Sequence, residues 1–307
     1  MAERVRKVAI VTDASADLPG SIELRRKLGV ESVVEIPIGL TIGEDSYVVG
    51  TSVNTEYPPI DNDTFRQRIE REMEKKSGIM PKTSASLEID FEHKYGELIE
   101  QGLDVVSIHV SEAFSRTIPN ARSAREIVDD NRISIFDSQT TSMALGLMVR
   151  EAEEMAISGA SREEILERLT DIRERTTLRA ATTNLPFLVA GGRVPEVKAM
   201  LGRILKLVPV IKIDHIAKLS DVKPVGMFKS GIKKQGVEWM EDYVKSKNPE
   251  RMAIVDFAAK DVSDELAMRL IRNNVLPEDK IYRGDLGPIT GSNGGPGTWA
   301  AIVVRGR

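Results

Sequence analysis

Val8-Ala9-Ile10-Val11-Thr12 is the stretch that decides the fold class, because such a continuous, largely apolar run is typical of a parallel strand buried on both faces. The segment that follows, Asp13-Ala14-Ser15-Ala16-Asp17-Leu18-Pro19, reads as a loop, and a helical pattern carrying Leu24 and Leu28 comes after it. A buried strand, a loop and a helix in this order predict an α/β protein with a parallel sheet covered by helices.

The alternation continues along the chain. Apolar runs predict further strands at 33–38, 105–110 and 133–136, and helical spacing predicts helices over 65–73, 87–99, 143–159 and 161–172, the last with a capping box of Ser161 and Glu164. Residues 43–63 have weak periodicity and several Gly, Asp and Pro residues, so we expect a surface excursion there.

The pattern changes after about residue 175. Strands are expected at 179–183, 251–257 and 299–304, and residues 210–219 are expected to form two short arms around a turn at Asp214-His215. We therefore predict two domains: an N-terminal parallel-sheet α/β domain (1–175) and a C-terminal α/β domain with a mixed or antiparallel sheet (176–307).

Composition excludes several classes of function. A net charge of -4 and an aromatic content of 5% give no basis for binding nucleic acid. Without cysteine there is no disulfide, thiolate metal site or cysteine nucleophile, and the three histidines lack metal-ligand spacing, so we expect neither a metal nor a cofactor. No signal peptide or long apolar run is visible, so we expect a cytoplasmic protein without stable membrane insertion.

Two hydroxyl-rich blocks are candidates for a ligand site. They are Lys82-Thr83-Ser84-Ala85-Ser86 and Ser111-Glu112-Ala113-Phe114-Ser115-Arg116-Thr117, and the second directly follows a predicted strand. Loops at the carboxyl ends of parallel strands bind ligands, and converging Ser and Thr hydroxyls would suit a small anion. Ordinary helix capping is the alternative interpretation.

Two glycine-rich segments allow two interpretations each. Gly191-Gly192-Arg193-Val194 is either a helix end or a loop that places Arg193 at a cleft or partner surface. Gly291-Ser292-Asn293-Gly294-Gly295-Pro296-Gly297 is either a turn-rich loop or a close approach of backbone to a ligand, and it lacks the Gly-Lys-Ser/Thr ending of a phosphate-binding loop.

Taken in order, these motifs resemble the DegV family of fatty-acid-binding proteins over nearly the whole chain. The similar segments are Val11–Pro19, Thr83–Ser86, Ser111–Thr117 with Asn120, Ala121 and Ala124, Asp137-Ser138, Gly191–Val194 and Gly294–Gly297.

The resemblance implies two α/β domains with one long-chain fatty acid, the expected ligand, buried between them. It implies that Thr83 and Ser115 hold the carboxylate, and it assigns Ser84, Arg116, Thr117 and Asn293 to the same end of the site. Asn293 stands where the family usually has His, and Arg116 stands where it has Gly. Arg116 either replaces the missing cation by turning inward or is solvated outside.

The resemblance further implies a protein that is not an enzyme by itself. It would present the fatty acid to a separate fatty acid kinase, which forms an acyl phosphate, and Arg193 is the expected partner contact. Two alternatives stay open: a carrier of a different amphipathic carboxylic acid, and a stand-alone phosphotransferase or hydrolase that uses Asp13 or Asp137. Ser115 lacks the Gly-x-Ser-x-Gly surroundings of a hydrolase nucleophile.

Overall fold

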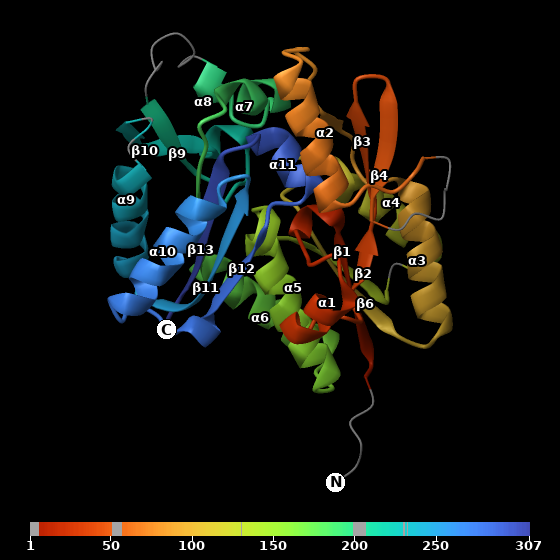
Figure 1. Ribbon diagram of the computed structural model, residues 1–307. Coiled ribbons are helices and arrows are strands. Elements are labelled where there is room, and N and C mark those ends of the chain that lie inside the picture. The colour runs from red at the N-terminus through yellow and green to blue at the C-terminus, as the bar shows by residue number, and fades with distance from the viewer. Residues whose placement is uncertain (1–5, 51–56, 130, 199–206, 230, 232) are drawn as a thin grey trace.

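The computed structural model describes residues 6–50, 57–129, 131–198, 207–229, 231 and 233–307. Two β-sheets stand side by side with helices between them and on both outer faces, so the layers run helix, sheet, helix, sheet, helix (Figure 1). A smaller, three-stranded sheet lies above these layers in the same view, together with further helices. This is the α/β architecture predicted from the sequence.

The N-terminal sheet is parallel and has the order β2-β1-β6-β7. Its strands are β1 (Val8–Asp13), β2 (Val34–Ile36), β6 (Asp104–His109) and β7 (Ile133–Asp137). The expected strand at 33–38 is divided at Pro37, because proline has no N–H to donate to the ladder. Strand order reverses between β1 and β6, and in open α/β sheets such a switch point forms a crevice at the strands' carboxyl ends.

Helices cover both faces of this sheet. Helices α3 (Glu88–Glu100) and α4 (Thr117–Val128) lie on the outer face. Helices α5 (Ser142–Ile157) and α6 (Arg162–Arg175) lie on the inner face and also contact the second sheet. The predicted capping box of α6 is confirmed, since Ser161 Oγ accepts from Glu164 N and Glu164 Oε2 accepts from Ser161 N.

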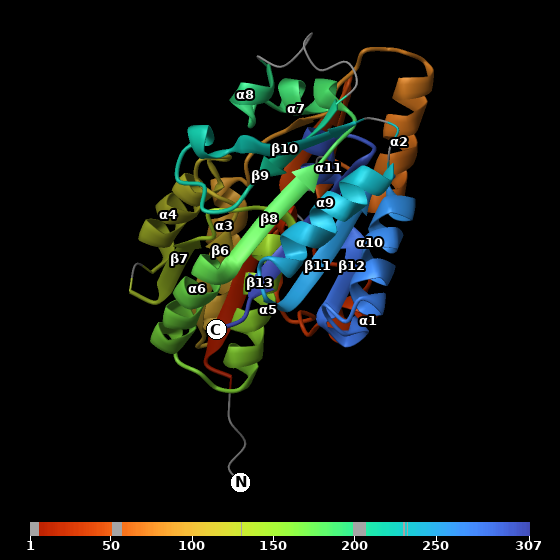
Figure 2. The same ribbon diagram turned by 90° about the vertical axis from the view of Figure 1, so that its left-hand side faces the viewer.

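The second sheet is mixed and has the order β10-β9-β8-β13-β11-β12. Only β11 and β12 pair in parallel among its described strands. The strands are β8 (Thr176–Ala181), β9 (Leu207–Lys212), β10 (Lys223–Lys229), β11 (Pro249–Phe257), β12 (Ile281–Asp285) and β13 (Thr298–Arg305). Helices α9 (Lys233–Lys245) and α10 (Lys260–Arg272) cover its outer face (Figure 2).

The prediction that residues 210–219 form two short arms around a turn is wrong. Strand β9 pairs with β10, and the segment between them folds back on the body of the protein. Asp214 is buried and its Oδ1 accepts from the backbone N–H of Leu178, while the N–H of Ile216 donates to the carbonyl of Gln139. The apolar alternation at Ile216 therefore reflects burial under a loop and not strand pairing.

Of the remaining elements, the three-stranded sheet and helices α2, α7 and α8 lie at the top of Figure 1, whereas α1 lies lower, beside the N-terminal sheet. The three-stranded sheet has the order β4-β3-β5, with β3 (Ile38–Ile42), β4 (Asp45–Val49) and β5 (Lys82–Thr83). The helices are α1 (Ile22–Leu28), α2 (Asn62–Glu74), α7 (Leu185–Gly191), α8 (Pro195–Lys198) and α11 (Pro288–Gly294), with 3-10 turns η1 (Ala14–Ala16), η2 (Leu219–Asp221) and η3 (Glu278–Lys280).

Two expectations change in this region. Part of the expected excursion at 43–63 is the β3–β4 hairpin, while residues 51–56 lie outside the described chain. The glycine-rich stretch 291–297 begins as the end of α11 and not as a loop. Glycine is accommodated in this helix because Gly291 packs against the rings of Phe65 and Phe257.

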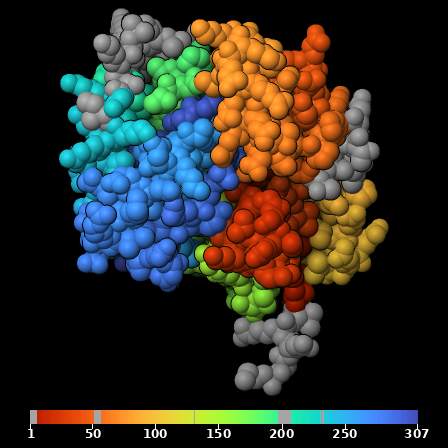
Figure 3. All heavy atoms as spheres, in the orientation of Figure 1, coloured from red at the N-terminus to blue at the C-terminus, as the bar shows by residue number. Residues whose placement is uncertain are grey.

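The two halves of the chain are packed into one body. The change of sheet falls between Arg175 and Thr176, yet a single hydrophobic cluster contains buried residues from both halves. The red and orange N-terminal elements directly abut the blue C-terminal half in the space-filling view (Figure 3).

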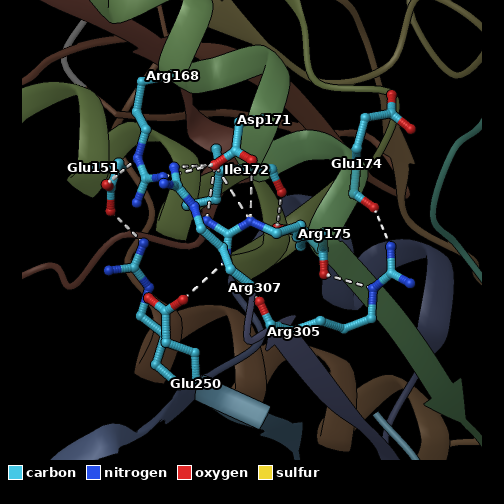
Figure 4. Close-up of polar contacts among 11 residues, drawn as sticks. Glu151, Arg168, Asp171, Ile172, Glu174, Arg175, Glu250, Arg305 and Arg307 are labelled. Atoms are coloured by element: carbon cyan, nitrogen blue, oxygen red, sulfur yellow. Dashed lines mark hydrogen bonds and ion pairs between the residues drawn. The ribbon is translucent and has the colours of Figure 1, made fainter. Parts of the chain in front are cut away.

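Ion pairs also join the halves, on the side away from the small sheet. Arg175 at the end of α6 donates to Asp171, to Glu250 and to the carbonyl of Arg305 (Figure 4). Glu151 on α5 accepts from Arg168 and from Arg251 of β11. Helices of the N-terminal half are thereby tied to two strands of the second sheet.

Candidate functional site

A cavity of about 140 Å³ lies between the two halves. Its walls come from the loops after β1, β6 and β7, and from β5, β8, β9, β13, α7 and α11. The lining is mostly apolar and includes Ile38, Val110, Phe114, Leu178, Leu188, Ile211, Ile213 and Ile289. An apolar cavity with a few polar groups is the usual form of a small-molecule site.

The first hydroxyl-rich block contributes Thr83 and Ser84 to the cavity wall. Strand β5 places them there by pairing with β3, where Thr83 lies opposite Leu40. Ser84 Oγ accepts from the N–H of Gly39 at 3.2 Å and donates to the carbonyl of Ala85 at 3.1 Å. Within the described chain the Thr83 hydroxyl makes no hydrogen bond, so it is available to a ligand.

The structure brings the second block against the first. Ser115 lines the cavity, and its Oγ lies 2.8 Å from Thr117 Oγ1. Thr117 Oγ1 in turn lies 3.4 Å from the N–H of Ser86. Thr117 is fully buried and is not part of the cavity wall, so it supports Ser115 and does not face the space itself.

The structure decides between the alternatives left open for the two arginines. Arg116 is exposed at the start of α4 and does not line the cavity, so the inward orientation does not occur. Arg193 lines the cavity, and it is the charged member of the described wall. Its Nε donates to the carbonyl of Phe114 at 3.3 Å and its Nη1 to that of Gly191 at 2.6 Å.

Asn293 on α11 also lines the cavity. Its Nδ2 donates to the carbonyl of Ile289 at 2.9 Å. Its Oδ1 lies so close to Gly191 that a Cβ at that position would come within 2.5 Å. Five of the residues assigned by resemblance therefore lie around one cavity: Thr83, Ser84, Ser115, Arg193 and Asn293.

Several polar residues of the wall were not predicted. They are Ser15, Thr141, Ser142, Thr182, Thr290 and Thr298. Ser15, Ser142 and Thr182 each follow the carboxyl end of a strand, which is the sequence signal that could have identified them. Thr298 is 5% exposed, and its hydroxyl has no hydrogen-bond partner within the described chain.

Asp13 belongs to a buried chain of side chains and not to the cavity wall. Its Oδ2 lies 3.0 Å from His109 Nδ1, His109 Nε2 lies 2.6 Å from Ser107 Oγ, and Ser107 Oγ accepts from Tyr95 at 2.7 Å. All four residues are fully buried. The three residues Asp13, His109 and Ser107 match the spacing of a hydrolase triad, but Ser107 lies within the sheet, where no substrate reaches it.

The pKa of Asp13 reflects this setting. Burial by itself raises the pKa of the carboxyl, but the hydrogen bond and charge of His109, with bonds from Ser15 and the N–H of Val110, bring it below its usual value. Asp137 is bonded to the N–H of Gln139, and burial raises its pKa. Neither aspartate lines the cavity, which weakens the interpretation of a hydrolase or phosphotransferase.

Other features of the described chain were also considered as sites. A larger hollow of about 990 Å³ lies beside the ion pairs of Figure 4, and its wall includes Lys7, Glu151, Glu154 and Arg168. Its charged lining does not suit an apolar ligand. In the described residues no cluster of His, Asp or Glu has the arrangement of a metal site, and no helix is long and apolar enough to cross a bilayer.

Fold and cavity together define a class of protein: two α/β halves that enclose an apolar space whose described wall contains hydroxyls and an arginine. The family model described as "Uncharacterised protein, DegV family" matches residues 7–306, and the chain belongs to the DegV family. A DegV domain-containing protein of Listeria innocua is 27% identical over 304 residues, which are 96% of this chain and 98% of the relative.

Solved structures show the same fold. A DegV family protein from Thermus thermophilus, described by its fatty acid binding, is 25% identical with a TM-score of 0.81 and covers 97% of this chain and 99% of its own. A stearic acid-binding protein from Eubacterium ventriosum is 20% identical with a TM-score of 0.80, covers 97% of this chain and 98% of its own, and supports the fold alone.

Proposed function

We propose that this protein binds a long-chain fatty acid between its two halves, with the acyl chain in the apolar cavity and the carboxylate at Thr83 and Ser115. The observation that carries the proposal is the convergence of both hydroxyl-rich blocks on one apolar cavity. The fatty acid binding of the related protein from Thermus thermophilus supports the same ligand class.

The physical chemistry of the wall suits this ligand. Burying an acyl chain stabilises a complex by about 0.8 kcal/mol per CH₂. A buried carboxylate must be hydrogen-bonded, and hydroxyl and guanidinium donors supply charge-assisted bonds. Within the described chain, neither the Thr83 hydroxyl nor Arg193 Nη2 makes a hydrogen bond to another residue. The carboxylate therefore has both a neutral donor and a cation in the wall.

We further infer that the bound acid is presented to a separate kinase. The reaction would transfer the terminal phosphoryl group of a nucleoside triphosphate to a carboxylate oxygen, giving an acyl phosphate and a nucleoside diphosphate. Ser84 is exposed while it also lines the cavity, so the carboxylate end lies near the surface. Arg193, which is half-buried at the same cavity, is the residue proposed to contact the partner.

Thr83→Val and Ser115→Ala test the carboxylate site. Each variant removes a hydroxyl and should weaken the binding of palmitate by about 1–3 kcal/mol, because a buried charge loses a donor. Calorimetric titration of the delipidated protein measures the effect. Denaturing mass spectrometry of freshly purified protein first identifies any ligand that copurifies, which also distinguishes a fatty acid from another amphipathic acid.

Thr170→Val is the matched control, because Thr170 is exposed on α6 and bonds only to the carbonyl of Leu166 in the described structure. It should leave the affinity unchanged. Equal affinity in the wild type and in both site variants would reject the assigned carboxylate site. If the wild type neither carries a lipid nor binds palmitate, the fatty-acid function itself is rejected.

A further inference from the structure

Asp17 joins three elements that meet behind the cavity wall. It follows η1, and its Oδ2 accepts from Ser142 Oγ at the start of α5 at 2.5 Å. Its Oδ1 accepts from the N–H of Gly287, the N-cap of α11, at 3.0 Å, and Thr290 Oγ1 lies within 2.9 Å of both carboxyl oxygens. Asp17 thus holds a helix of the C-terminal half against the N-terminal half.

The residues that Asp17 holds belong to the cavity. Ser142 and Thr290 line it, and α11 also supplies Ile289 and Asn293. Asp17 itself is 6% exposed and is not part of the wall. The approach is close, because a Cβ on Gly287 would lie 2.8 Å from Asp17 Oδ1. Asp17 therefore does not touch a ligand in the cavity, and it acts on one through α5 and α11 and through its charge.

The backbone on both sides of this contact is constrained. Asp17 has φ 51° and Ser142 has φ 59°, a left-handed conformation that non-glycine residues adopt infrequently. Residues kept in such conformations are held there by their surroundings and often accompany functional sites. The contact between Asp17 and Ser142 is therefore specified by the fold and is not an incidental surface bond.

No described Lys, Arg or His forms an ion pair with this carboxyl. The nearby titratable groups are Glu35 on β2, whose charge is compensated by Arg25 of α1 at 2.7 Å, and Tyr282 and Asp285 on β12, the latter paired with Arg66 of α2 at 3.0 Å. Asp13 lies on β1, directly before the same turn. Burial raises the pKa of Asp17 to about 7, against the lowering effect of its hydrogen bonds.

Both protonation states can satisfy the hydrogen bonds. The ionised carboxylate accepts from Ser142, Gly287 and Thr290. The protonated form can donate to Thr290 Oγ1, whose own hydrogen then turns to the carbonyl of Gly287 at 3.3 Å. The contact therefore persists in both states while its charge changes.

We propose that Asp17 is a positioning residue for the bound acid, which fastens α11 to the N-terminal half and makes the affinity for an anionic ligand fall as the pH rises through neutrality. The inference rests on the proposed fatty-acid function. An ionised Asp17 places a negative charge behind the wall of the cavity into which the anionic ligand brings a second negative charge, whereas the protonated form does not. Binding of the anion is therefore coupled to proton uptake by Asp17.

The test compares palmitate with the uncharged hexadecanol at pH 6, 7 and 8. With palmitate, the wild type should lose about fivefold in affinity relative to Asp17→Asn between pH 6 and 8, which is the change over this range when binding raises the pKa of Asp17 from about 7 by one unit. Dividing the affinity of the wild type by that of the variant at each pH cancels the effect of the ionisation of palmitate itself. Hexadecanol affinity should not depend on pH in either protein, since the ligand carries no charge.

Asp17→Ala and Thr290→Val separate anchoring from charge. Each substitution should lower the affinity for palmitate and for hexadecanol at every pH, because α11 is no longer held against the N-terminal half. Thr290→Val provides this result even if Asp17→Ala does not fold. Asp285→Asn is the matched control, since it removes an exposed carboxylate from the adjacent strand, and it should retain the wild-type pH profile.

An identical pH profile for palmitate in the wild type and Asp17→Asn overturns the inference. The loss of the profile in Asp285→Asn also overturns it, because the charge would then lie elsewhere. Failure of the wild type to bind either ligand at any pH rejects the fatty-acid function instead.

Discussion

Asp13 and Asp17 lie in the same short segment after β1, yet their surroundings move their pKa values in opposite directions. Both are buried. Asp13 accepts hydrogen bonds from His109, from the N–H of Val110 and from Ser15, and the pKa is lowered. Asp17 has no basic partner in the described chain, so burial dominates and the pKa rises to about 7.

Asp13→Asn should destabilise the protein by about 2–4 kcal/mol, because the amide NH₂ would oppose donors that now point at a carboxylate. A lowered pKa means that the ionised group stabilises the fold above the pKa of the unfolded chain, near 3.8. The difference in free energy of unfolding between the wild type and the variant should therefore narrow as the pH falls below that value.

Urea denaturation at neutral and acid pH measures this difference. Ser15→Ala is a useful comparison, since it removes one neutral donor to Asp13 and should cost less. A fully stable Asp13→Asn at neutral pH would contradict the role of Asp13 as an ionised acceptor.

Single residues were predicted unevenly by the sequence. The resemblance to the family assigned Thr83 and Ser115 by the position of each hydroxyl-rich block in the order of motifs, and both residues line the cavity. The directions of Arg116 and Arg193 depend on local packing, which periodicity does not report. Asp17 was read as a loop residue, since its partners Ser142, Gly287 and Thr290 are far away in sequence.

At the scale of elements, the contact between α7 and α11 shapes the cavity. Gly191 ends α7, and Asn293 of α11 packs directly against it. Gly192 follows with φ 71° and open space around its Cα, as expected for a glycine at a helix C-terminus. Two adjacent glycines are thus required for different reasons, one steric and one conformational.

Gly191→Ala should destabilise the protein by about 1 kcal/mol, because its Cβ displaces Asn293 and breaks the bond to Ile289. In an Asn293→Ala background the same change should be neutral or stabilising, since alanine is the better helix former. Gly192→Ala should cost about 1 kcal/mol in both backgrounds, because its strain is in the backbone. Thermal unfolding of the double-mutant cycle measures the coupling, and an equal cost of Gly191→Ala in both backgrounds would refute the steric account.

Elements whose pattern is set by burial were predicted well. Strands β1, β6, β7, β11 and β13 each contain a largely apolar run, and the structure confirms them. Helix α11 was missed because three of its seven residues are Gly or Pro, and only tertiary packing makes it helical. The segment after β9 was wrongly predicted as its pairing partner, because alternation of apolar residues does not identify which strand pairs with β9.

At the scale of the whole molecule, the two halves are held together by the shared hydrophobic cluster and by the ion pairs around Arg175. Arg175 is 9% exposed and bonds to Asp171, Glu250 and the carbonyl of Arg305. The carboxylates are partly exposed, so solvent screens them, but the carbonyl lies at a strand end that Arg175 covers.

Arg175→Met should lower the free energy of unfolding by about 1–3 kcal/mol, because it leaves several polar groups without their partner. Arg307→Met is the control: Arg307 also bonds to Asp171 but its side chain is 72% exposed, so the cost should stay below about 0.5 kcal/mol. Chemical denaturation at low and high salt measures both. Equal costs for the two variants would show that the buried contacts of Arg175 contribute little.

The cavity is walled by both sheets, so whatever fills it becomes part of the interior that unfolding must expose. A ligand present at 100 times its dissociation constant adds about 2.7 kcal/mol to the free energy of unfolding. Heat resistance in a crude extract then serves as a gauge of occupancy. A change in the supply of this ligand to the cell would then change how long the protein survives proteolysis.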